Sequence, residues 1–159
     1  MISRLFALVM LAAALSAPAR AEDAAEIERL AGAIAQEAAV RAHALARAPA
    51  APAFAPPPGD PLLADLNDFA LQALALSREI DARGGPQDLR CIFRGMGRDV
   101  AVRIEELETA PDRAAQSRAY REIEYLARQA EDIAADPEAR GVDTSYQICE
   151  ADASPAESD

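Results

Sequence analysis

Two cysteines, Cys91 and Cys149, carry the sharpest chemical signal in this sequence. In an oxidising compartment, two cysteines in one small domain usually form a disulfide. The alternative is a redox-active or metal-binding thiol pair, but the chain has no C-x-x-C motif and no histidine near either cysteine to lower a thiol pKa. We therefore expect a structural disulfide that closes a loop of about 59 residues.

Three arginines next to the first cysteine form the second pattern with chemical potential. Arg90, Arg94 and Arg98 recur every fourth residue, which places them on one stripe of a helix. The interpretation that we favour is solvated pairing with nearby acidic side chains, worth at most about 1 kcal/mol for each exposed pair. The alternative is a binding site for an anion or an acidic partner.

The composition excludes several classes of function. The chain has 159 residues, with 27 Asp and Glu against 16 basic residues, and a formal net charge of −11. A polyanion repels the phosphates of nucleic acids and of anionic membrane surfaces, so we expect neither as a partner. The single histidine, His43, is predicted to face solvent, and with two cysteines it excludes most zinc and haem sites. We expect no cofactor, no metal and no catalytic centre.

The N-terminus has the pattern of a secretory signal peptide over residues 1–21. Arg4 supplies the positive charge, residues 5–17 form an apolar stretch, and residues 19–21 read Ala-Arg-Ala, a cleavage pattern. The apolar stretch is too short to span a bilayer comfortably, which disfavours an uncleaved membrane anchor. The absence of lysine and the alanine richness suggest a GC-rich bacterium. We therefore expect a periplasmic or secreted bacterial protein that begins at Glu22 and does not bind membranes after cleavage.

The elements that must position these residues are helices. Apolar residues recur at intervals of three and four along four segments, and no hairpin signal is present. The sequence predicts an all-α, antiparallel four-helix bundle, or a three-helix core with a tethered N-terminal helix. The expected division is a helix over 22–47, a linker over 48–61, a helical core over 62–150 and a disordered acidic tail over 151–159. Within the core, helices are expected at 61–83, 86–109 and 112–135.

Residues 48–61 contain six prolines, which remove backbone donors and exclude a helix or a central strand. We interpret this segment as a spacer whose residues 48–60 make no contacts with the core. The alternative is that its three consecutive prolines are a ligand for an aromatic groove. Asp60 is a good N-cap for the helix that follows, and Pro61 suits its first position.

Two glycines, Gly95 and Gly97, interrupt the third predicted helix at a cost of about 1 kcal/mol each. We expect Gly97 to let a neighbouring helix approach closely, and Gly95 to face the side of Cys91. There, the segment 143–149 would cross the outer side of the helix if the disulfide forms. The alternative is a kink or pocket where a ligand meets the backbone.

These patterns favour a protein that acts by protein–protein interaction as an adaptor, inhibitor or accessory subunit. A bundle that binds a small molecule or a cation is the main alternative. A hydrolase with two carboxylates is a third hypothesis, because any two of the 27 acidic residues could converge in space.

Overall fold

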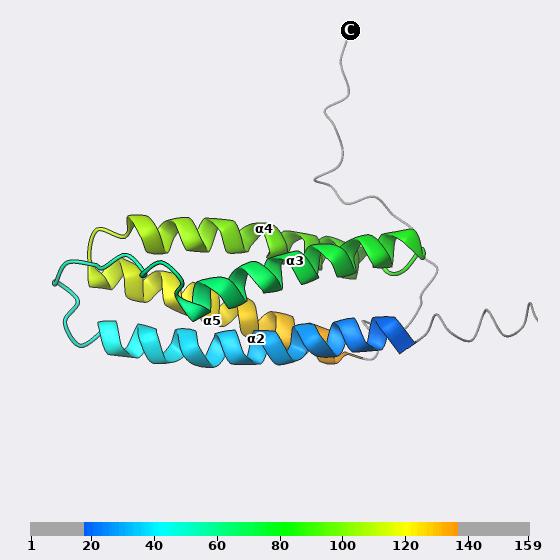
Figure 1. Ribbon diagram of the computed structural model, residues 1–159, viewed down its shortest axis with the longest axis horizontal. Coiled ribbons are helices and arrows are strands. Elements are labelled where there is room, and N and C mark those ends of the chain that lie inside the picture. The colour runs from blue at the N-terminus through cyan, green and yellow to red at the C-terminus, as the bar shows by residue number, and fades with distance from the viewer. Residues whose placement is uncertain (1–17, 137–159) are drawn as a thin grey trace, which may run out of the picture.

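The computed structural model describes residues 18–136, with side chains described from Asp23 onward. The helices in this part of the chain are α2 (Pro18–Leu45), α3 (Pro61–Ala82), α4 (Gln87–Thr109) and α5 (Arg113–Ala135). Successive helices run in opposite directions, and the last of them, α5, lies beside α2 and closes the bundle (Figure 1). The predicted all-α bundle is confirmed. The alternative of a three-helix core with a tethered N-terminal helix is wrong, because α2 packs against α5 in the largest of the interfaces between the described helices.

Several predictions lie outside the described residues. These are the apolar stretch of the signal sequence, Cys149 with the segment leading to it, and the acidic tail over 151–159. Helix α2 begins before Ala21, so the expected cleavage would remove its first turn. Within residues 18–136, no helix combines the length and the apolar character that crossing a membrane requires.

The ends of the helices follow from local chemistry. The Asp60 side chain accepts a hydrogen bond from the Leu62 amide at 2.9 Å, which caps α3 as predicted. At the other end of α3, Gly84 adopts a left-handed φ of 64°, and the Gly85 amide donates to the Ile80 carbonyl at 2.8 Å. A residue with a side chain adopts this φ only with strain, so glycine ends the helix here.

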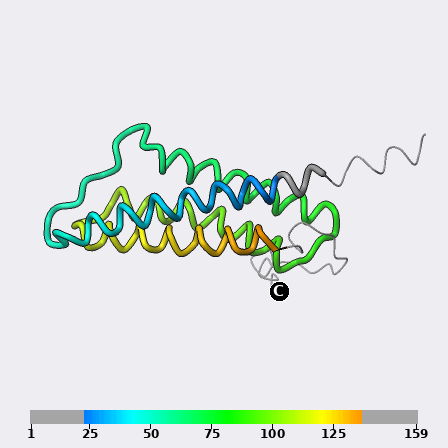
Figure 2. Tube along the Cα trace, turned by 90° about the horizontal axis from the view of Figure 1, so that it is seen from below, coloured from blue at the N-terminus to red at the C-terminus, as the bar shows by residue number. Residues whose placement is uncertain are grey.

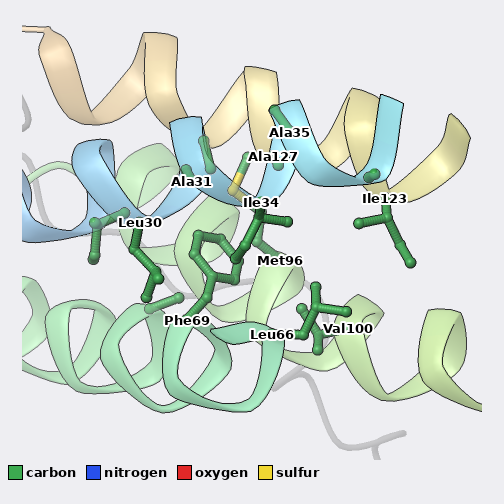
Figure 3. Packing of buried hydrophobic residues seen from close by; sticks show 14 of the residues in the cluster. Leu30, Ala31, Ile34, Ala35, Leu66, Phe69, Met96, Val100, Ile123 and Ala127 are labelled. Carbon is green, nitrogen blue, oxygen red and sulfur yellow. The ribbon is translucent and has the colours of Figure 1, made fainter. Parts of the chain in front are cut away.

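The core fills the space between the four apolar stripes. Phe69 of α3 and Phe93 of α4 are the largest of its side chains that are almost completely buried. Figure 3 shows the Phe69 ring pointing toward Ile34 of α2. The buried faces of α2 and α5 are rich in small residues, which let the two helices pack closely. These alanines are Ala24, Ala31, Ala35, Ala38 and Ala42 on α2, and Ala119, Ala127, Ala130 and Ala134 on α5.

The two glycines of α4 have different surroundings. A Cβ atom at Gly97 would lie 2.9 Å from Leu74 Cγ and 3.0 Å from the Ala70 carbonyl oxygen. The lack of a side chain therefore lets α4 approach α3, as the sequence predicts. A Cβ atom at Gly95 would meet no described atom within 4 Å.

We expect alanine substitutions at these two positions to change stability in opposite directions. Gly97→Ala should lower the free energy of unfolding by about 1–3 kcal/mol, because the backbone of α3 must move away. Gly95→Ala should raise it by about 0.5–1 kcal/mol, because alanine favours the helix and meets open space. Urea unfolding of the two variants measures both values, and a gain in stability at Gly97 would contradict the close approach of α3 and α4.

The proline segment is not a free spacer. Pro52 forms an isolated antiparallel bridge with Asp112, and the chain from Ala46 to Asp60 lies across the end of the bundle (Figure 2). The prediction that residues 48–60 make no contacts is therefore wrong. It failed because proline removes amide donors and leaves every carbonyl free to accept hydrogen bonds.

Candidate functional site

The candidate site is a groove at the end of the bundle that carries the α2–α3 connection and the α4–α5 turn. We call this end the turn end (Figure 1). The groove has a volume of about 280 Å³ and lies between the last turn of α2, the proline segment and the first turns of α5. Its walls combine apolar residues with two arginines, Arg41 and Arg113.

The first turn of α5 holds the proline segment in place. Amides at the start of a helix have no partner inside the helix. Here, the Arg113 amide donates to the Ala51 carbonyl at 3.0 Å, and the Ala114 amide donates to the Pro49 carbonyl at 3.1 Å. The carbonyls of a proline-rich segment thus satisfy the unpaired donors of the helix, which explains why this segment docks here.

Phe54 is the aromatic residue that this docking presents at the surface. Its carbonyl accepts a hydrogen bond from Gln116 Nε2 at 2.6 Å, and its ring lies 5.4 Å from the guanidinium carbon of Arg113. The side chain is nevertheless 67% exposed. A large apolar ring is therefore held in a defined position, with most of its surface open to solvent.

Arg41 ties the opposite wall of the groove together. Its Nη1 atom lies 2.6 Å from Asp60 Oδ2, its Nε atom lies 2.7 Å from Glu37 Oε1, and its guanidinium lies over the Tyr120 ring at 5.8 Å. Asp60 is 5% exposed and also caps α3. The hydrogen bond from Arg41 is the largest influence holding the pKa of Asp60 below its ordinary value, and the bond to Asp60 in turn raises the pKa of Arg41.

A pH prediction follows from the lowered pKa of Asp60. A carboxyl whose pKa is lower in the folded state stabilises the fold above the unfolded pKa of about 3.9, and this stabilisation is lost as pH falls through the folded pKa. From pH 5 to pH 2, we expect the Asp60→Asn variant to lose less stability than the wild type. Urea unfolding across this range tests the difference. The control is Asp68→Asn, which removes the same charge from an exposed position of α3. Equal slopes for wild type and Asp60→Asn would contradict the pairing with Arg41.

Arg113 differs from Arg41 in its partners. Among the described residues, no acidic side chain pairs with Arg113, and its Nε atom is buried without a hydrogen-bond acceptor. Its guanidinium contacts the Phe54 ring. The groove therefore holds one arginine that acidic side chains neutralise and one that they do not.

The predicted arginine stripe on α4 is not one exposed surface. Arg90 is 6% exposed and forms an ion pair with Asp81 of α3, so the expectation of solvated pairing is wrong for this residue. Its backbone carbonyl also accepts a hydrogen bond from the Ser77 hydroxyl at 2.9 Å. Arg94 is half-buried and Arg98 is exposed. Arg90 thus joins α3 to α4, which the spacing of the arginines could not reveal.

The other residues with predicted chemistry lie apart from the groove. Cys91 is half-buried on α4, and its predicted partner Cys149 falls outside the described residues, so the disulfide stays a prediction. His43 is exposed on α2, as expected. Within the part of the chain that the structure describes, no three His, Cys, Asp or Glu side chains cluster as metal ligands.

The groove and the roles of Arg113 and Gln116 were not predicted from the sequence, and Phe54 was placed in a segment expected to make no contacts. One signal was available: Phe54 is the single aromatic residue in a segment otherwise made of alanine, proline, glycine and aspartate. An aromatic ring has little reason to occur in a free spacer, and its presence indicated an anchor or a binding residue. No protein-family model, curated protein or solved structure matches this chain.

Proposed function

We propose that this protein is an exported helical interaction module, acting as an adaptor, inhibitor or accessory subunit, and that the turn end of the bundle is its binding surface. The observation that carries the proposal is Phe54, whose ring is 67% exposed although its own carbonyl and those of Pro49 and Ala51 accept hydrogen bonds from α5. Aromatic side chains dominate the energetics of protein interfaces, particularly beside pockets from which water is excluded.

The docking of the proline segment supports this role in a second way. Association is costly when loops must become ordered on binding, so a ring that is already fixed in place binds with a smaller loss of entropy. The hydrogen bonds from Arg113, Ala114 and Gln116 provide that order before any partner arrives. The groove beside the ring, at about 280 Å³, has the size for one or two side chains of a partner.

Export and the disulfide belong to the same proposal. A signal sequence cleaved after Ala21 would deliver the chain to the bacterial periplasm or the medium, where a Cys91–Cys149 bond forms and persists. The bond would attach the C-terminal segment to α4 and leave the turn end free. The competing hypothesis is a bundle that binds a small molecule or a cation.

Site-specific photocrosslinking in a producing bacterium tests the proposal. A photoreactive phenylalanine analogue is placed at position 54 or, as the control, at position 71, where Leu71 of α3 is equally exposed at 67%. We expect a discrete covalent adduct with another protein from position 54 and none from position 71. Equal labelling from both positions, or an adduct with a small molecule in place of a protein, would contradict the proposed role.

A further inference from the structure

The groove also indicates the chemistry of its occupant. Building on the proposed function, we propose that Arg113 makes the groove a receptor for a carboxylate side chain, carried by an apolar, acidic segment of a partner polypeptide. Three observations lead to this inference: the charge that Arg113 leaves unbalanced, the donor that it leaves unbonded, and the apolar surface beside it.

The first observation is the unbalanced positive charge of Arg113. Of the two arginines that line the groove, Arg41 is neutralised by Asp60 and Glu37. Arg113 has no acidic partner among the described residues. A protein with a formal net charge of −11 thus presents a cation at the turn end of the bundle, beside the exposed Phe54 ring. A partner with the opposite charge at this point complements it.

The second observation is the Nε–H group of Arg113, a hydrogen-bond donor without an acceptor among the described residues. A guanidinium binds a carboxylate best through two parallel N–H groups, and the Nε–H group belongs to one of the two edges that make this pair. Arg113 Nε is buried and has no acceptor in the described part of the chain. The Phe54 ring lies beside this guanidinium and is itself largely exposed, so a carboxylate that enters along the ring approaches Arg113 without disturbing the core.

The apolar wall favours a polypeptide over a free anion. Phe54, Leu45 and Pro57 line the groove next to Arg113. A small inorganic anion would gain nothing from these surfaces, whereas apolar residues beside a glutamate would cover them. The chain's own acidic C-terminus is another source of carboxylates. That segment starts about 35 Å from the groove, because α5 begins at the groove and ends at the opposite end of the bundle, and substitution of its acidic residues tests this source.

Nuclear magnetic resonance on the full exported chain tests the inference with two synthetic probes. The first is acetyl-Leu-Glu-Leu-amide, and the second is its neutral twin, acetyl-Leu-Gln-Leu-amide. The readout is the Nε–Hε signal of Arg113. We expect the glutamate probe to shift this signal and to bind at least tenfold more tightly than the glutamine probe. Arg113→Gln should abolish the difference. The control Arg118→Gln, which removes the same charge from an exposed position of α5, should preserve it.

Three other outcomes would each overturn the inference. Equal binding of the two peptides would mean that the groove recognises apolar surface alone, and a crosslink from position 54 would then still support the proposed function. An equal effect of acetate at the same concentration would indicate a site for small anions. A shift of the Arg113 signal in the free chain on Glu157→Gln with Asp159→Asn would mean that the chain's own C-terminus occupies the groove.

Discussion

Replacing Phe69 with alanine is expected to lower the free energy of unfolding by about 3–5 kcal/mol. The ring is almost completely buried and lies against Ile34 at the centre of the bundle (Figure 3). Its removal loses the free energy of burying the apolar ring and leaves a cavity that the surrounding helices fill only in part. Urea unfolding monitored by circular dichroism measures the loss.

Phe54→Ala provides the matched control, because it deletes the same side chain from an exposed position. We expect a loss below about 1 kcal/mol, since the side chain is mostly exposed and loses a surface contact with the Arg113 guanidinium. The difference between the stability losses of the two variants should thus distinguish a phenylalanine that stabilises the fold from one that is available to a partner. Losses of similar size in the two variants would contradict the division between core and surface.

Replacing Cys149 with serine is expected to lower the free energy of unfolding by up to about 4 kcal/mol, because the loop that the proposed disulfide closes becomes free in the unfolded chain. The four helices should persist, because the buried core of residues 18–136 joins all four of them directly. Far-UV circular dichroism and thermal melting of oxidised wild type and Cys149→Ser measure the two effects.

The double variant Cys91→Ser with Cys149→Ser separates the bond from the side chains. If the cysteines are paired, each single substitution and the double substitution should cost about the same, since the bond is lost in every case. An unchanged melting temperature in Cys149→Ser would contradict the pairing. Loss of the helical signal at room temperature would mean that the packed stripes do not suffice to form the bundle.

Local sequence patterns predicted the helices and several of their ends. The spacing of Leu62, Leu66 and Phe69 defines the buried face of α3, and all three are buried. Asp60 and Gly84 start or stop the helix through interactions within a few residues, so their roles are visible in the sequence alone. The role of Gly97 is visible in the same way, because a glycine at the edge of an apolar stripe indicates that a neighbouring helix approaches closely there.

Contacts between residues far apart in the sequence could not be predicted from these local patterns. Phe54 and Gln116 are 62 residues apart, and their contact depends on how the chain returns along α5. Arg90 belongs to a regular stripe of arginines, yet it is buried against α3, where Asp81 pairs with its side chain and the Ser77 hydroxyl donates to its backbone carbonyl. Helical periodicity assigns a direction to each side chain but does not show which neighbour will meet it.

The proposed interaction and the role of Arg113 both require that the proline segment is docked on α5 in solution. Amide hydrogen exchange at Arg113 and Ala114 measures this docking directly. Amides in the first turn of a helix have no partner within the helix and exchange rapidly unless another group accepts their hydrogen bonds. The acceptors here are the carbonyls of Ala51 and Pro49.

We therefore expect slow exchange of both amides in the wild type. Exchange should be fast in a variant whose residues 49–54 are replaced by six glycine and serine residues, because this flexible chain keeps the carbonyls but loses more conformational entropy on docking than the proline segment does. The amide of Ala115, which donates to the Asp112 side chain at 2.8 Å, reports whether the start of α5 is still intact. Slow exchange at Arg113 and Ala114 that disappears in the variant would agree with the docked segment. Fast exchange at both amides in the wild type, with Ala115 protected, would contradict it and remove the surface on which the proposed function depends.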